Sequence, residues 1–160
     1  MTTEARTEAG DAGPRIADLS GFEIVSALAA GRLPPPPMAQ TLPFTLLPPD
    51  MGRVALIALP EARFLNPAQT LHGGWIMTLL DTAMALAAQT TLPPGEICPS
   101  HETSAKFVRP ITVQSGRMHI HGHVLSRGRT VITLEGSVED DSGRLHAHGT
   151  STCLILRRSA

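Results

Sequence analysis

The chain has 160 residues, a formal net charge of −1 and a hydrophobic content of 42%. This length fits one domain with a hydrophobic core of its own. Aromatic side chains are scarce, with four Phe, one Trp and no Tyr, so a stacking platform for single-stranded nucleic acid is not expected. The near-zero charge likewise excludes a global field that would draw the chain to DNA or to an anionic membrane.

The sequence predicts a soluble, cytoplasmic protein. Its start, MTTEARTEAGDAGPR, lacks the basic and apolar regions of a signal peptide. The most apolar run, residues 71–90, is interrupted by His72 and Asp81 and does not reach the character of a membrane span. Cys98 and Cys153 have no metal-site spacing and are too few for a disulfide framework, so we expect reduced thiols.

The N-terminal part of the chain is expected to hold one short helix. Residues 1–18 are polar, small and charged and are predicted to be disordered, which leaves a single domain over residues 19–158. Ser20 is a candidate N-cap, and Glu23 stands where a capping box requires it. The prolines at 34–37 cannot continue a helix and predict a stiff, extended connector.

Two strands and a long helix are predicted next. Residues 39–47 and 52–59 have the pattern of strands, joined by the turn PPDMG. Residues 73–89 predict a long helix that ends before the prolines of TLPPGE. This helix is apolar on nearly all sides, so it must be wrapped by a sheet or covered by a partner.

The C-terminal half predicts antiparallel strands. In RMHIHGHVL the histidines share one face and the apolar residues share the other. The segments RTVITLEGSVE and RLHAHGTSTCLIL repeat this alternation and are joined by the hairpin turn DDSG, while PSHETSAKFVRP predicts one more strand. The expected fold class is therefore α+β, with five or six antiparallel strands and one long helix between the second and third.

Asp81 is the one acid within the predicted long helix, and it has three interpretations. It is a surface residue on a polar stripe, a core residue paired with a distant arginine, or a catalytic group. Its neighbours one helical turn away carry no charge, and the flanking basic residues along the chain are Arg63 and Lys106. Because burying an unpaired carboxylate is costly, catalysis is the favoured interpretation.

The start of the same helix is a second candidate element. Gly73 and Gly74 allow a carbonyl to approach the free N–H groups and the positive end of the helix dipole, although a plain loop-to-helix junction has the same pattern. Gly73 and Asp81 are eight residues apart, which is roughly 12 Å along a helix. Either they serve different ends of a ligand, or two chains meet with antiparallel helices and form two shared sites.

The segment NPAQTLHGGWIMTLLDTAMALA, the strand AKFVRPI and the corner VLSRGRT resemble the hotdog-fold thioesterases of the phenylacetate-pathway (PaaI-type) class. The resemblance covers residues 21–156. It implies a curved antiparallel sheet around one long helix, in a dimer or a tetramer. It also implies hydrolysis of aryl- or medium-chain acyl-CoA without a cofactor, since CoA is part of the substrate.

The same resemblance implies roles for residues of the central motif. Asp81 is the general base or nucleophile, and the backbone N–H of Gly73 polarises the thioester carbonyl. Asn66 lies across the subunit boundary and helps to hold the carbonyl or the attacking water. Ser100 matches a position at which relatives carry a hydroxyl that orients the water. His72 is interpreted as fixing the start of the helix without acid–base work.

The corner VLSRGRT is where relatives bind the CoA nucleotide. Arg127 and Arg129, on either side of Gly128, are therefore candidate phosphate ligands. Solvated hairpin arginines have the same pattern, so this alternative stays open.

Four other functions are weighed against hydrolysis. Five histidines on two strands resemble a metal cluster, but no metal site is expected because they are predicted to face solvent or another dimer (His119, His121, His123, His146, His148). A hotdog dehydratase would pair a histidine with an acid, and a non-catalytic acyl-CoA binder would use nearly the same residues. A DNA-binding regulator is not expected, since the first 38 residues are too few for a helix-turn-helix.

Overall fold

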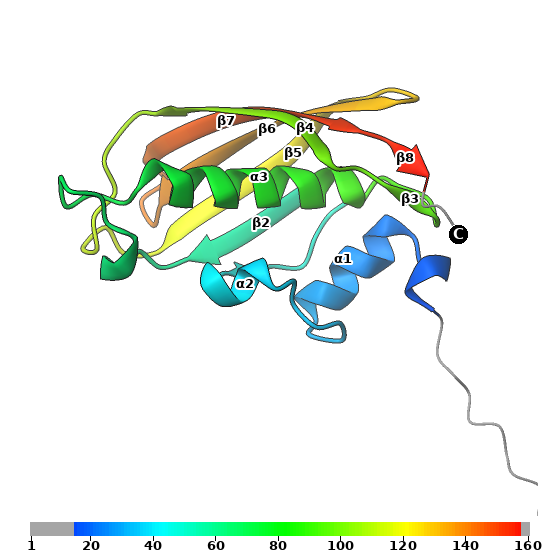
Figure 1. Ribbon diagram of the computed structural model, residues 1–160, viewed down its shortest axis with the longest axis horizontal. Helices are drawn as coiled ribbons and strands as arrows, with labels where there is room; N and C mark the ends of the chain where they lie inside the picture. Colours follow the sequence, from blue (N-terminus) through cyan, green and yellow to red (C-terminus); the bar gives the residue numbers. More distant parts are fainter. Residues whose placement is uncertain (1–14, 158–160) are drawn as a thin grey trace, which may run out of the picture.

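The computed structural model describes residues 15–157, and these form a curved antiparallel sheet around one long helix (Figure 1). The helix, α3 (Gly73–Gln89), has the predicted bounds and lies across the inner face of the sheet. The sheet has six strands in the order β1-β2-β5-β6-β7-β4. Their bounds are β1 (Thr45–Leu46), β2 (Arg53–Ala58), β4 (Ser100–Phe107), β5 (Met118–Arg127), β6 (Val131–Asp140) and β7 (Leu145–Leu154). The hotdog arrangement implied by the sequence is therefore confirmed.

A small second sheet lies at the C-terminal end of α3. It pairs β3 (Glu96–Ile97) with β8 (Leu156–Arg157) in antiparallel orientation. The turn DDSG joins β6 to β7 as predicted, with a hydrogen bond from Gly143 N–H to the Asp140 carbonyl.

The N-terminal helix α1 (Gly21–Ala29) begins with the predicted capping box. The Ser20 hydroxyl accepts a hydrogen bond from the Glu23 N–H, and the Glu23 carboxylate accepts one from the Ser20 N–H at 2.8 Å. Before it, a single 3-10 turn (Ile16–Asp18) occupies the end of the segment predicted to be disordered. Residues 1–14 lie outside the described residues.

The prediction of a strand over residues 39–47 is wrong. Residues Met38–Thr41 form the short helix α2, and β1 keeps only two residues of that segment. Pro37 has helical backbone angles and starts the turn, and Pro43 has no N–H to donate to a strand ladder. The second predicted strand is confirmed as β2. A 3-10 turn (Ala62–Phe64) lies in the loop that precedes α3.

Close contact between α3 and the sheet depends on three glycines. Gly122, Gly136 and Gly149 lie side by side in the register of β5, β6 and β7. A Cβ atom at Gly122 would lie 2.5 Å from the backbone of Ala83, and one at Gly136 would lie 3.2 Å from the Met84 side chain. We call these three residues the glycine row. It makes room for the helix, whose inward side chains are fully buried.

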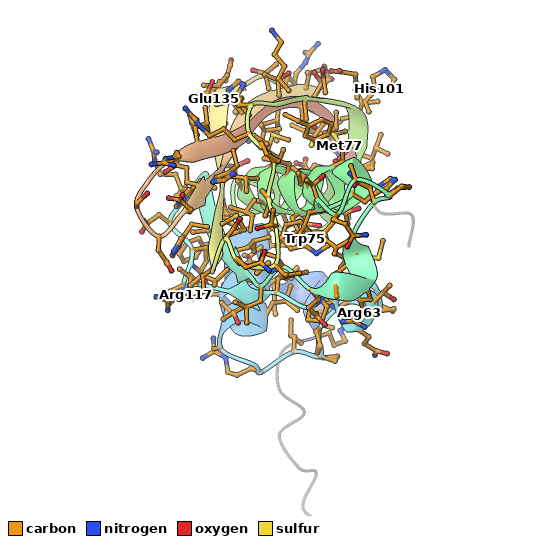
Figure 2. All side chains as sticks on the ribbon, turned by 90° about the vertical axis from the view of Figure 1, so that its left-hand side faces the viewer. Arg63, Trp75, Met77, His101, Arg117 and Glu135 are labelled. Carbon is orange, nitrogen blue, oxygen red and sulfur yellow. The ribbon has the colours of Figure 1, made fainter. Side chains whose placement is uncertain are left out.

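The outer face of the sheet carries most of the histidines, as predicted. His119, His121 and His123 alternate with the buried apolar residues of β5, and Glu135 projects outward on the neighbouring strand (Figure 2). His146 is an exception to the prediction. It is only 6% exposed, and its Nε2 lies 3.3 Å from the Asp140 carboxylate. It lies at an irregularity in the β6–β7 register, which alters the alternation there.

No helix within residues 15–157 has the length and apolar character needed to cross a membrane.

The glycine row yields a test of the fold. Replacing Gly122 by Val should lower the free energy of unfolding by about 1–3 kcal/mol or more, because the new side chain meets the backbone of α3. Chemical denaturation of the variant and of His121→Ala, an exposed position on the same strand, measures this. A Gly122→Val variant as stable as His121→Ala would show that the helix does not lie on this row.

Candidate active site

Asp81 projects from α3 toward the edge strand β4. Its side chain is half-buried, and its Oδ1 accepts a hydrogen bond of 2.7 Å from the hydroxyl of Thr103. In the view along α3, Met77, one turn earlier on the same side of the helix, lies on the β4 side, and Trp75 lies on the opposite side (Figure 2). The carboxylate is therefore held between the helix and the sheet rather than on an open surface stripe.

Asp81 has no cationic partner within residues 15–157. None of the Arg, Lys or His ion pairs of this part of the chain includes it. The structure therefore does not support the interpretation of Asp81 as a core residue paired with a distant arginine. A half-buried carboxylate that only a hydroxyl stabilises keeps the capacity to accept a proton.

The Thr103 hydroxyl continues into a chain of hydrogen bonds. It lies 3.0 Å from the hydroxyl of Ser151, and Ser151 donates to the backbone carbonyl of Glu102 at 2.9 Å. Thr103 and Ser151 are opposite each other in the β4–β7 register. Neither residue was singled out in the sequence, although Ser151 belongs to the inward-facing alternation of RLHAHGTSTCLIL.

Two buried thiols lie next to this chain. The Cys98 sulfur is 3.8 Å from the carbonyl oxygen of Ala85, one turn after Asp81 on α3. A hydrogen bond between the two thiols, together with burial, raises the pKa of Cys98, and the same hydrogen bond lowers the pKa of Cys153 to about 7. The negative charge of Asp81 acts on Cys153 in the opposite direction. Both cysteines are free thiols, as predicted.

The start of α3 presents a backbone donor. His72 is the N-cap, and its Nδ1 accepts a hydrogen bond of 2.9 Å from the Gly74 N–H. This contact fixes the start of the helix, the role that the sequence favoured for His72. Within residues 15–157 the Gly73 N–H has no acceptor. A Cβ atom at Gly73 would lie 3.0 Å from the Phe107 ring, so a larger residue would crowd this donor.

Asn66 and Gly73 line the same cavity, which has a volume of about 290 Å³ and also involves Ile76, Phe107 and Arg109. The Asn66 Oδ1 accepts hydrogen bonds from the Ala68 and Thr70 N–H groups, so it fixes its own loop. Its Nδ2 donates to the Thr70 hydroxyl and has a second hydrogen to offer. Asp81 is not among the residues that line this cavity.

The remaining predicted site residues lie farther along the sheet. Ser100 begins β4 opposite Cys153, with which it hydrogen-bonds, and the hydroxyl bonded to Asp81 is that of Thr103 instead. The register shift between Ser100 and Glu102 places Ser100 on the same side of β4 as Thr103, because the two residues lie opposite the buried Cys153 and Ser151 of β7. Thr103 shares the half-buried side of β4 with Ala105, so strict alternation along PSHETSAKFVRP is the signal that could have found it.

The arginines of the predicted CoA corner lie near the C-terminal end of α3. The Arg127 Nε donates to the Thr91 hydroxyl at 3.3 Å, and its guanidinium is 4.0 Å from the Glu96 carboxylate. Arg129 is exposed in the turn between β5 and β6.

No group of three or more His, Cys, Asp or Glu side chains is arranged to hold a metal ion within the described part of the chain. The outer-face histidines pair with carboxylates instead, for example His119 with Asp141 at 2.8 Å and His123 with Glu135 at 2.9 Å.

Comparison with known proteins agrees with this architecture. A model of the thioesterase superfamily matches residues 68–147. A protein of Saccharolobus solfataricus named as an esterase is 33% identical over 109 residues, which are 68% of this chain and 75% of the relative. A phenylacetic acid degradation-related protein from Ralstonia eutropha JMP134 has a TM-score of 0.74 and 29% identity, covering 81% of this chain and 98% of its own. A Streptococcus mutans UA159 protein, solved with acetyl CoA bound, has a TM-score of 0.66 and 22% identity, covering 73% and 91%, and shows a shared fold alone.

The curved sheet around α3 places the molecule among the hotdog-fold proteins. The matched residues include both the Gly73–Gly74 pair and Asp81, and they define the family: this chain belongs to the thioesterase superfamily. It is a thioester hydrolase, and its resemblance to the thioesterases of the phenylacetate pathway is confirmed.

Proposed function

We propose that the protein hydrolyses acyl-CoA thioesters with aryl or medium-chain acyl groups, and that it does so as a homodimer with two shared sites. The observation that carries the proposal is the carboxylate of Asp81, which is half-buried, bonded to a hydroxyl and free of a cationic partner in residues 15–157. A carboxylate in this state is suited to take a proton from a bound water.

The reaction needs no cofactor. Asp81 accepts a proton from water while the water oxygen bonds to the thioester carbon, and the carbonyl oxygen becomes an oxyanion. The Gly73 N–H at the positive end of α3 donates to that oxygen. The C–S bond then breaks, and the CoA thiolate takes the proton from Asp81. The products are a free acid and CoA.

Two copies of the chain are required because one helix separates the base from the oxyanion donor. Gly73 and Asp81 are eight residues apart, which is roughly 12 Å along the helix, and they lie against different residues of β4. The edge strand β4 supports a specific arrangement. Most of its side chains are exposed, and one long side of its backbone is unpaired within the described residues.

Pairing two copies of β4 in antiparallel orientation completes the site. Thr103, which holds Asp81, lies near the middle of the strand, and Phe107, which covers Gly73, is its last residue. Antiparallel pairing centred on Ala105 would set Thr103 of one copy opposite Phe107 of the other, and so bring Asp81 of one copy toward Gly73 of the other. Asn66 would then act across the subunit boundary.

Cavities around the site are suited to the two ends of such a substrate. An opening of about 440 Å³ beside Gly74 is lined by apolar groups of Leu42, Phe64 and Trp75, and it is a candidate pocket for the acyl group. Arg129 and the partly exposed Arg127 offer cations for the CoA phosphates. The acetyl CoA bound by the Streptococcus mutans protein of this fold is consistent with a CoA ester as substrate.

Replacing Asp81 by Asn tests the base. The variant should lose about 10²–10⁴-fold in kcat, the usual contribution of a general base, while its melting temperature stays near that of the wild type. The assay is release of the CoA thiol from a panel of aryl- and alkyl-acyl-CoAs, with an enzyme-only blank because Cys98 and Cys153 can react with the thiol reagent.

Asp50→Asn is the matched control, since Asp50 is exposed in the turn before β2. Turnover by Asp81→Asn equal to that of this control would contradict the role of Asp81. Binding of CoA esters without any hydrolysis by the wild type would favour the non-catalytic acyl-CoA binder. Hydration of an enoyl-CoA in place of hydrolysis would favour the dehydratase.

Mixed dimers test the shared site. Asn66→Asp keeps the loop acceptor and removes the amide donor, so Asp81→Asn and Asn66→Asp subunits should each be nearly inactive alone. Equal co-expression should restore about a quarter of the wild-type activity, because half of the dimers are mixed and each has one intact site of two. Activity that remains at the level of the single variants would show that each site lies within one subunit.

A further inference from the structure

Asp81 is bonded to a chain of two hydroxyl groups, those of Thr103 and Ser151. The family match assigns no role to this chain. Thr103 Oγ1 lies 2.7 Å from Asp81 Oδ1 and 3.0 Å from Ser151 Oγ, and Ser151 Oγ lies 2.9 Å from the Glu102 carbonyl oxygen. The four groups form a line from the helix through β4 into β7. Ser151 is 3% exposed, so the far end of this line is closed to solvent.

A buried serine at this point of β7 calls for an explanation. Its neighbours on the inward face are Gly149 and the fully buried Ala147 and Cys153. An alanine at position 151 would pack there without needing a hydrogen-bond partner, whereas burying a hydroxyl costs free energy unless it is bonded. Ser151 bonds to Thr103 and to the Glu102 carbonyl, and it also contacts the Cys153 thiol.

The hydrogen-bond chain has enough donors to stabilise an ionised Asp81. Each hydroxyl has one hydrogen that rotates to suit its acceptors. When Asp81 is negative, Thr103 donates to it and Ser151 donates to the Glu102 carbonyl or to Thr103. A hydrogen bond donated to a carboxylate stabilises its charged form. The Oδ2 atom has no bonded partner within residues 15–157, so this oxygen is available to a water.

The same hydrogen-bond chain also provides an acceptor for the hydrogen of a protonated Asp81. The carboxylic acid then donates to Thr103, Thr103 donates to Ser151, and Ser151 donates to the Glu102 carbonyl. Every hydrogen has an acceptor, and only hydroxyl rotations separate this state from the ionised one. An arginine in the place of Thr103 would stabilise the charged form alone.

We infer that Thr103, with Ser151 behind it, is a positioning pair that holds Asp81 Oδ1 and accommodates both protonation states of the base during turnover. This inference rests on the proposed function of Asp81. It assigns to Thr103 no contact with the substrate: Thr103 acts through Asp81, and Ser151 acts through Thr103.

Three variants and a control test the pair. Thr103→Val removes the hydroxyl and keeps the shape, Thr103→Ser keeps the hydroxyl, and Ser151→Ala removes the second member. The matched control is Thr150→Val, an exposed threonine next to Ser151 on the outward side of β7. The measurements are kcat and KM for a CoA ester as a function of pH, together with the melting temperature of each protein.

Thr103→Val should lower kcat by about 10- to 100-fold, the range for losing a hydrogen bond to a charged group, with KM nearly unchanged. The acid limb of its pH profile should move to higher pH, because the ionised form of the base loses its donor. Thr103→Ser should restore both kcat and the limb. Ser151→Ala should also lower kcat and move the acid limb to higher pH, in each case by less than Thr103→Val. The double variant should differ little from Thr103→Val alone.

Other titratable groups near Asp81 would not produce the same changes in kcat and in the acid limb. The facing titratable groups are the thiols of Cys98 and Cys153, and the exposed Glu102 and His101 lie on β4. The pKa of Cys98 is raised and that of Cys153 is about 7, and an effect of either thiol would not be reversed by restoring a hydroxyl in Thr103→Ser. An effect of the outer side chains would persist in Thr103→Ser.

The outcomes distinguish a failure of the positioning pair from a failure of the proposed function of Asp81. Wild-type kcat and an unmoved acid limb in Thr103→Val, with Asp81→Asn inactive, would overturn the positioning pair alone. A Thr103→Ser variant as poor as Thr103→Val would overturn it as well, because the shape would then matter and the hydroxyl would not. Full activity of Asp81→Asn would instead remove the proposed function on which the inference depends. If Thr103→Val does not fold, Ser151→Ala decides, since an unchanged kcat and limb there also contradict the pair.

Discussion

The packing of α3 on the glycine row is the contact on which the rest of the molecule depends. Side chains at these three positions of β5, β6 and β7 would hold the helix away from the sheet, because a Cβ at Gly122 already meets its backbone at 2.5 Å. With hydrogens alone at these positions, the inward face of the helix is fully buried, and its rotation about its own axis is set. That rotation directs Asp81, at the middle of α3, to β4, while Gly73 lies at the start of the same helix.

The same rigid helix is the reason for proposing that the site is shared between two chains. A straight helix keeps Gly73 and Asp81 apart along its length, and no side-chain rotation closes that distance. In the proposed dimer, a second copy paired along the exposed strand β4 would bring its Gly73 N–H toward Asp81. The proposed dimer thus satisfies two separate requirements, since it covers an open sheet edge and brings an oxyanion donor to a base.

The chemistry of the base depends on the kind of partner it has. An ion pair with arginine would stabilise the carboxylate and weaken it as a proton acceptor, whereas a hydroxyl donates to the charged form and accepts from the neutral form. Thr103 and Ser151 provide partners of the second kind, and their position between strand and helix limits access by bulk water. One short chain of hydrogen bonds therefore both holds Asp81 in place and suits its proposed role as a base.

Local patterns in the sequence determined much of the fold. The capping box at Ser20, the bounds of α3, the β6–β7 hairpin and the alternation of His119 to His123 all follow from interactions within a few residues, and the structure confirms them. The segment 39–47 was mispredicted because its apolar pattern suits a strand, while Pro37 and Pro43 limit what its backbone can form.

The sequence by itself also identified Asp81 and the glycines at the helix start as unusual, since an isolated acid in an apolar helix is visible without coordinates. Only the tertiary structure decided which group holds that acid. Thr103 and Ser151 are 22 and 48 residues away from their partners along the chain, and the β4–β7 register brings Thr103 opposite Ser151. Contacts of this kind depend on how strands are aligned with one another, and strand alignment is a property of the packed sheet that no short stretch of sequence contains.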